Sequence, residues 1–183
     1  GNGKNSVAKS PRVLASTVVR NFTRNIKLQM KHSIIIIFSI LSIIQANAQK
    51  IKFKDLNLKK ALIELGYDRN KNSEIEIKEI DTIQKLNISK RNIKLLDDLV
   101  YFKNLKDLNA MTNEIKEINA LNGNQSIHEL NLGENKVGPK LTIKDMPNLT
   151  GVYAFRNGIN EFEFVGEYLK LKSLYIQGNP VEY

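Results

Sequence analysis

The sequence of 183 residues contains no cysteine. This absence excludes a disulfide framework, a thiolate metal site, a cysteine nucleophile and the lipid-modified cysteine of a bacterial lipoprotein. Hydrophobic residues make up 42% of the chain and charged residues 26%, which is the balance of a globular protein. Because no covalent cross-link is available, packing has to stabilise the fold.

Acidic residues are missing from the first 48 positions, which contain seven lysines and arginines. The whole chain has a formal net charge of +9, but residues 49–183 hold 21 basic and 19 acidic residues and are almost neutral. The excess positive charge therefore lies in residues 1–48, which we call the leader. A nucleic-acid partner is not expected, because the rest of the chain lacks the charge excess that such binding requires.

The leader has the pattern of a secretory signal peptide. Met30 and Lys31 begin it, a mostly apolar stretch runs from 34 to 44, and an A-x-A cleavage pattern ends at Ala48. A transmembrane helix is the competing interpretation, but a bilayer requires about 20 apolar residues. The sequence predicts a signal peptide over residues 30–48, cleavage after Ala48 and no stable membrane span afterwards. The product is then expected to be secreted, on the cell surface or periplasmic.

Residues 1–29 precede the methionine at which such a signal peptide would start. We interpret them as an upstream or non-native extension. The alternative is targeting sequence of another kind, because basic residues and serines without acids resemble an organellar transit peptide.

Residues 83–183 repeat with a period of 22 residues. In each of five repeats the first and fourth positions are apolar and the sixth is apolar or alanine; the repeats begin at Ile83, Leu105, Ile127, Leu149 and Leu171. The eleventh position is isoleucine or valine in all five repeats. The ninth position is asparagine in four of them: Asn113, Asn135, Asn157 and Asn179.

This pattern resembles the leucine-rich repeat family, L-x-x-L-x-L-x-x-N-x-L, and most closely its internalin-type bacterial surface members. The resemblance implies an α/β solenoid in which five parallel strands form a concave face and the asparagines form a structural ladder that bonds to the backbone. The last repeat ends at Tyr183 without a polar cap. We therefore expect the chain to be truncated there, or to associate end to end.

Residues 49–82 are expected to form an N-terminal helical cap on the first repeat. Asp55 suits the N-cap of a helix, and Gly66 suits its left-handed C-terminal position. Apolar residues at helical spacing between them form the expected buried face: Leu58, Ala61, Leu62 and Leu65.

The loop that follows this helix matches the spacing of an EF-hand calcium loop. Residues with oxygen ligands occupy positions 1, 3, 5, 7 and 12 of that pattern: Asp68, Asn70, Asn72, Glu74 and Glu79. Ser73 stands at position 6, where glycine is preferred. A weak calcium site and a polar turn that binds no metal are both compatible with these residues. The order of helix, loop and repeats resembles secreted leucine-rich repeat proteins of the Bacteroidetes type.

Side chains at the third, fifth and seventh positions of each repeat are expected to point outward from the concave sheet. In the later repeats these positions carry aromatic residues, which we expect to cluster on adjacent strands. The candidate ligand-binding residues are Tyr153, Phe155, Tyr175, Met111, Asn131 and Gln177. The alternatives are aromatic packing that only stabilises the sheet, or burial under a following segment.

No catalytic residue is predicted. His128 is the only histidine after the leader, and it is expected on a solvated strand edge beside Glu129. Nucleophile elbows, phosphate loops and zinc-ligand spacings are missing from the sequence. The sequence therefore predicts an exported binding module rather than an enzyme, which recognises a protein or glycan through its concave face. The alternatives are a structural spacer that holds another domain, and a calcium-stabilised module.

Overall fold

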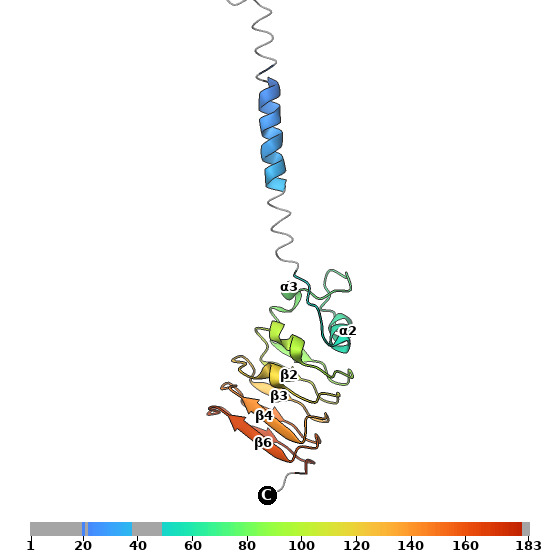
Figure 1. Ribbon diagram of the computed structural model, residues 1–183, viewed down its shortest axis with the longest axis vertical. Helices are drawn as coiled ribbons and strands as arrows, with labels where there is room; N and C mark the ends of the chain where they lie inside the picture. Colours follow the sequence, from blue (N-terminus) through green and yellow to red (C-terminus); the bar gives the residue numbers. More distant parts are fainter. Residues whose placement is uncertain (1–19, 21, 38–48, 181–183) are drawn as a thin grey trace, which may run out of the picture. The chain divides into compact units, whose positions relative to one another are not determined.

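The computed structural model describes residues 20, 22–37 and 49–180, and the chain divides into two compact units, 1–47 and 48–183. In the first unit, residues 22–37 form a helix with exposed side chains (Figure 1). Among the described residues, no helix is long and apolar enough to cross a membrane. The predicted cleavage point after Ala48 lies outside the described residues.

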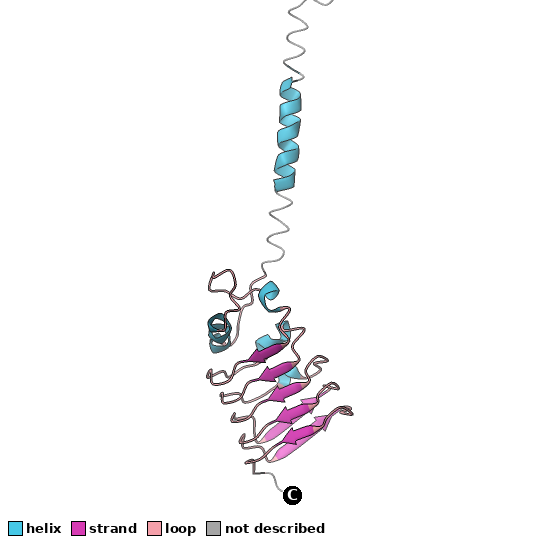
Figure 2. Cartoon of the chain, turned by 180° about the vertical axis from the view of Figure 1, so that it is seen from behind, coloured by secondary structure: helices cyan, strands magenta, loops and turns pink. Residues whose placement is uncertain are grey.

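The second unit contains a parallel five-stranded sheet whose strands stack at a constant interval along the chain (Figures 1 and 2). The strands are β1 (Lys85–Asn87), β2 (Asp107–Asn109), β3 (Glu129–Asn131), β5 (Gly151–Tyr153) and β7 (Ser173–Tyr175). Paired residues on neighbouring strands are 22 positions apart, as in the pair of Leu86 and Leu108. The parallel-strand solenoid predicted from the repeat is therefore confirmed.

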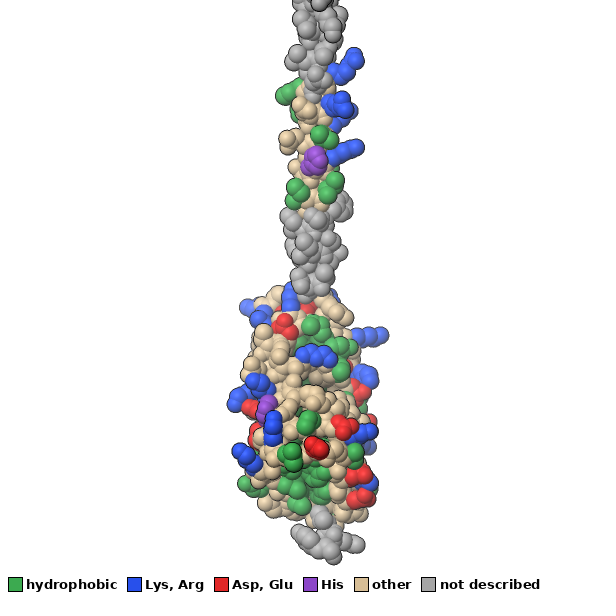
Figure 3. Space-filling view, turned by 90° about the vertical axis from the view of Figure 1, so that its left-hand side faces the viewer, with side chains coloured by type: hydrophobic (Ala, Val, Ile, Leu, Met, Phe, Trp, Pro, Cys, Tyr) green, Lys and Arg blue, Asp and Glu red, His purple; other side chains and the backbone are tan. Residues whose placement is uncertain are grey.

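The fourth and sixth positions of the repeat form the core between successive turns. Leu86, Leu108, Leu130 and Val152 are at most 2% exposed, and the sixth-position side chains of the first four repeats are fully buried. One turn cannot bury its apolar face alone, so each turn is stabilised by its neighbours. Leu174 of β7 remains 41% exposed, and Figure 3 shows hydrophobic side chains gathered toward this end of the solenoid.

The segments that connect successive strands of the five-stranded sheet form the opposite side of the solenoid, and their secondary structure differs between the first and the later turns. The first two turns carry short 3-10 helices, η1 (Asp97–Tyr101) and η2 (Asn119–Leu121). The later turns instead carry a second parallel sheet of β4 (Lys140–Lys144) and β6 (Glu161–Val165), which lies behind the five-stranded sheet in Figure 2. Helices are therefore few, and strands dominate the fold.

The second unit begins with two helices, α2 (Leu56–Glu64) and α3 (Ile77–Ile80). Asp55 is the N-cap of α2, because its Oδ1 accepts hydrogen bonds from the backbone N–H groups of Asn57 and Leu58. Three of the four residues expected on the buried face are buried. Leu65 is not: it is 39% exposed because it lies just beyond the last turn of the helix, before Gly66 at φ +83°.

Two aspartates connect this N-terminal segment to the first turn of the solenoid. The Oδ2 atom of Asp55 accepts from Lys94 N at 2.6 Å and from Leu95 N at 2.9 Å. In return, Oδ2 of Asp98 accepts from Lys54 N at 2.8 Å and from Asp55 N at 3.2 Å. The buried side chains of α2 belong to the same hydrophobic core as those of the first two strands.

Candidate functional site

A groove of about 350 Å³ lies on the outward face of the five-stranded sheet. Its floor consists of third- and fifth-position side chains from three adjacent strands: Lys85 and Asn87, Asp107 and Asn109, Glu129 and Asn131. Leu65 and Tyr67, which follow α2, close one end, and Tyr153 of β5 closes the other. Regular strands hold all six floor residues, so the groove is preformed.

The charged side chains of the groove have partners within the protein: Lys85 pairs with Asp107, and Glu129 accepts a hydrogen bond. Lys85 Nζ lies 2.8 Å from Oδ2 of Asp107, and this hydrogen bond raises the pKa of Lys85. Glu129 accepts a hydrogen bond of 2.6 Å from Oγ1 of Thr150 through Oε1. Its carboxylate lies directly over Gly151, where an added Cβ would come within 2.1 Å of Oε2. Glycine at position 151 therefore allows Glu129 to lie flat against the sheet.

Tyr153 and Tyr175 form a stacked pair at the end of the groove. Their ring centroids are 4.9 Å apart and their planes differ by 5°. The two residues are in register on β5 and β7, so the pleat of the sheet positions both rings. Burial, and then the nearby carboxylate of Glu129, raises the pKa of Tyr153. Both effects disfavour the phenolate form of Tyr153.

Phe155 is separate from this tyrosine pair. Its ring lies over Gly133, where an added Cβ would come within 2.3 Å of the ring. Within residues 49–180, the ring contacts are Tyr153 with Tyr175 and Phe164 with Tyr168, so Phe155 stacks on neither tyrosine. The three aromatic residues expected to cluster thus form a pair and one ring that packs on glycine.

Of the other three predicted ligand-binding residues, one lines the groove and two do not. Asn131 lies in β3 and lines the groove. Met111 and Gln177 stand at seventh positions, beyond the ends of β2 and β7, and do not line it. Leu65 was predicted on the buried face of the N-terminal helix and Tyr67 was not predicted at all. Both lie outside the repeat, so no periodicity connects them to the groove.

The ninth-position asparagines lie beside the core and bond to the backbone of neighbouring turns. Asn135 donates from Nδ2 to the carbonyls of Ala110 and Leu132, both at 2.9 Å, and accepts from Ile115 N at 3.0 Å. Asn113, Asn157 and Asn179 make equivalent bonds to the turn before their own. These amides hold successive turns together at the end of each strand.

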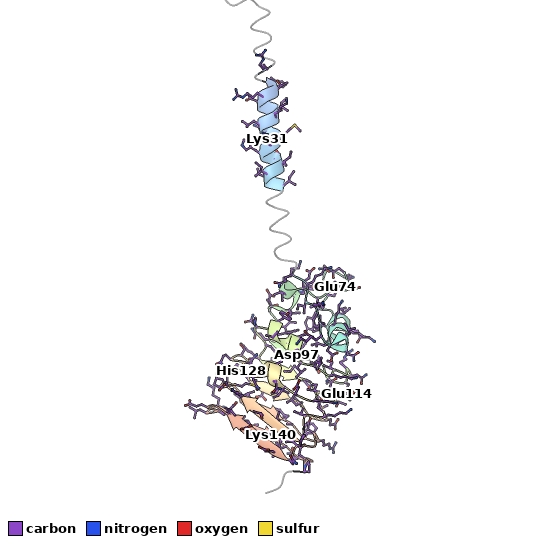
Figure 4. The ribbon with its side chains drawn as sticks, in the orientation of Figure 1. Lys31, Glu74, Asp97, Glu114, His128 and Lys140 are labelled. Atoms are coloured by element: carbon purple, nitrogen blue, oxygen red, sulfur yellow. The ribbon has the colours of Figure 1, made fainter. Side chains whose placement is uncertain are left out.

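The oxygen atoms of the loop over residues 68–79 accept hydrogen bonds from the loop itself. Asp68 accepts from Asn72 N and Ser73 N, at 3.0 and 2.8 Å. Ser73 has φ +62°, the left-handed conformation for which EF-hand loops use glycine. Glu74 instead pairs with Lys59 at 2.8 Å, and Figure 4 shows its position on this loop.

Glu79 is the central acceptor of this loop and is only 2% exposed. Its Oε1 accepts from Arg69 N at 2.9 Å and from Asn70 N at 3.4 Å, and its Oε2 accepts from Glu76 N at 3.0 Å. In the part of the chain that the structure describes, no group of three or more His, Asp or Glu side chains is arranged to hold a metal ion. Asn70 and Asn72 would contribute amide oxygens, which lie outside that group of ligands, so the calcium interpretation stays a prediction from the spacing of the sequence.

We expect Glu79→Gln to lower the free energy of unfolding by about 2 kcal/mol without added calcium. The amide nitrogen that replaces one carboxylate oxygen accepts no hydrogen bond, so at least one of the three backbone N–H groups loses its acceptor. Urea denaturation of the full chain, with and without millimolar calcium, measures this. Glu74→Gln is the control, since it changes a carboxylate of the same loop whose hydrogen-bond partner among residues 49–180 is the side chain of Lys59. A calcium-induced stabilisation that Glu79→Gln abolishes would instead support the metal site.

Comparison with protein-family models gives no match for this sequence, and comparison with curated proteins finds no similar sequence.

Proposed function

We propose that the chain is an exported leucine-rich repeat binding module that recognises a protein or glycan through the outward face of its five-stranded sheet. The observation that carries this proposal is the groove between Tyr67 and Tyr153, whose polar floor residues lie on regular strands. Aromatic residues that remain partly exposed on a rigid surface are typical of recognition sites.

The leucine-rich repeat assignment is supported by two features of the second unit. The strand register repeats every 22 residues, and the ninth-position asparagines bond to the backbone of adjacent turns. Residues 49–82 act as the N-terminal cap in this proposal. The bonds of Asp55 and Asp98 between α2 and the first turn support that role.

Export is proposed from the leader. Residues 30–48 serve as a cleaved signal peptide, residues 1–29 are an upstream extension, and residues 83–183 are the repeats. The protein then acts outside the cytoplasm, as a secreted, cell-surface or periplasmic component. A nucleic-acid partner is not part of the proposal, because the excess positive charge lies before residue 49.

Capture by the immobilised full chain tests the proposal. Extracellular and cell-surface material is applied to the unmodified chain, to a Tyr153→Ser, Phe155→Ser, Tyr175→Ser variant, and to a variant with Lys140, Thr142 and Lys144 of β4 changed to serine. We expect the first triple variant to lose about tenfold or more in affinity for the retained component, since aromatic anchors dominate recognition. The β4 variant, altered on the opposite sheet, should retain it.

Equal retention by all three proteins, or none by any, would contradict binding at the five-stranded sheet. That result would favour the interpretation of the solenoid as a spacer. Circular dichroism of each variant establishes that the solenoid remains folded before capture is compared.

A further inference from the structure

The floor of the groove presents a row of unused hydrogen-bond donors. Asn87, Asn109 and Asn131 occupy the fifth position of three adjacent strands. The Oδ1 atom of each accepts from the backbone N–H two residues later, at 3.1, 3.2 and 3.0 Å. Within residues 49–180, none of the three Nδ2 groups donates to another group. Each side chain is thus held by its oxygen, and its NH₂ remains available to a ligand.

Acceptors stand beside these donors on the same strands. Asp107 is two residues before Asn109, and its Oδ1 accepts no hydrogen bond from the described residues, because only Oδ2 pairs with Lys85. Glu129 is two residues before Asn131 and uses Oε1 for Thr150. On β2 and β3 the floor therefore places a carboxylate acceptor beside an amide donor, whereas β1 carries Lys85 beside Asn87.

The ends of the groove are aromatic and differ from its floor. Tyr153 is in register with Asn131, and its opposite side is covered by the stacked ring of Tyr175. The ring side toward β3 is thereby left as the wall of the groove. Tyr67 supplies a second aromatic group at the other end. A ligand that fits must offer many hydroxyl-like groups along its length and apolar ring faces at its ends.

We propose that this groove binds a short neutral oligosaccharide. This proposal rests on the binding function proposed above and names the class of ligand. Sugar hydroxyls both donate and accept, so they can satisfy Asp107 and Asn109 together, and the apolar face of a pyranose ring can pack on Tyr153. An anionic ligand is disfavoured, because Lys85 is already paired with Asp107 and the remaining charge of Glu129 is negative.

An extended peptide fits these donors less well than a sugar does. The three amide groups lie one strand apart, at intervals of about 4.8 Å. Backbone carbonyls on one side of an extended peptide recur at about 6.7 Å, which is two residues of strand rise. A peptide lying across the strands would therefore meet one of the amides and miss the next.

Titration of the full chain with neutral cello-, xylo-, manno-, malto- and chito-oligosaccharides tests the proposal by calorimetry and by the side-chain NH₂ signals in NMR spectra. At least one series should bind and shift the signals of Asn109 and Asn131. Asn131→Asp should lower the affinity about tenfold or more, because it replaces a donor with an acceptor while its Oδ1 still accepts from Gly133 N. Asn119→Asp, at an exposed position on η2, is the matched control.

The results separate this proposal from the broader binding function. Failure of every neutral oligosaccharide to bind, while a protein is captured through the aromatic residues, overturns the saccharide assignment and leaves the binding function standing. Preference for a sulfated or sialylated sugar, or for a peptide, also overturns it. Failure of both capture and titration contradicts both proposals.

Discussion

Replacing Asn135 with alanine is expected to lower the free energy of unfolding by about 3 kcal/mol and the melting temperature by roughly 10 °C. The side chain is 7% exposed and bonds to the turn before it and to its own turn. The carbonyls of Ala110 and Leu132 would still accept from Asn113 and Asn157. The N–H of Ile115 has no such substitute, and an unsatisfied buried donor accounts for much of the loss.

Asn131→Ala provides the matched comparison for this prediction. It removes an asparagine from the same repeat, four residues earlier, whose side chain accepts a single hydrogen bond from the described residues, from Gly133 N. We expect a loss of less than about 1 kcal/mol for that variant. Urea denaturation followed by circular dichroism measures both. Equal effects of the two substitutions would show that the ninth-position asparagines do not hold the turns together.

Asn135→Asp separates the two roles of the amide. The aspartate can still accept from Ile115 N, but it cannot donate to the two carbonyls, and at neutral pH it places a negative charge beside them. This variant should therefore be less stable than Asn135→Ala at neutral pH, because a buried unpaired charge costs more than a missing side chain. The difference should shrink as the pH falls and the carboxyl becomes protonated.

The repeat could be predicted because its core positions are chemically restricted. Only apolar side chains fit between turns, so residues such as Leu86, Leu108 and Leu130 reveal the 22-residue register directly. The N-terminal helix could be predicted for a similar reason, since Asp55 and the buried face of α2 follow local rules that need no distant contact. Patterns fixed by local chemistry are visible in one sequence.

A second regularity of the turns is not visible in the sequence. The eighth position of every repeat has a positive φ, between 51° and 72°, at Lys90, Thr112, Glu134, Arg156 and Gly178. Glycine or asparagine would be expected in this conformation, and only one of the five is glycine. The adjacent strands hold the chain in this turn, and in four of the five repeats the bonds of the following asparagine do so as well. The tertiary structure therefore overrides the local preference.

The candidate site was only partly predictable for the same physical reason. Periodicity identifies which side of a strand faces outward, and therefore finds Tyr153, Tyr175 and Asn131. It does not show that Gly133 leaves space for the ring of Phe155, because that contact depends on the side-chain orientation of Phe155, which belongs to the next repeat. It also cannot place Tyr67 at the end of the groove, since the path of the loop after α2 is set by contacts outside the repeat.

Asp55→Ala is expected to destabilise the protein by about 3 to 4 kcal/mol, more than a typical loss of a helix N-cap. The carboxylate accepts four backbone hydrogen bonds: two begin α2, and two come from Lys94 and Leu95 in the first turn of the solenoid. Hydrogen bonds to a charged group contribute more than neutral ones, and this group is 6% exposed. One substitution therefore weakens the helix and its attachment together.

Asn57→Ala tests whether the attachment is responsible for this effect. It removes one exposed bond between the same helix and the same turn, from Asn57 Nδ2 to the carbonyl of Asn92, and leaves the N-cap intact. We expect a loss below about 1 kcal/mol for this variant. Hydrogen exchange should locate the difference, because Asp55→Ala should speed the exchange of the Lys94 and Leu95 amides while Asn57→Ala should not. If the helix unfolds in Asp55→Ala while the repeats keep their full stability, α2 does not cap the solenoid. If both lose stability together, the bonds made by this single carboxylate join the N-terminal segment and the repeats into one cooperative unit.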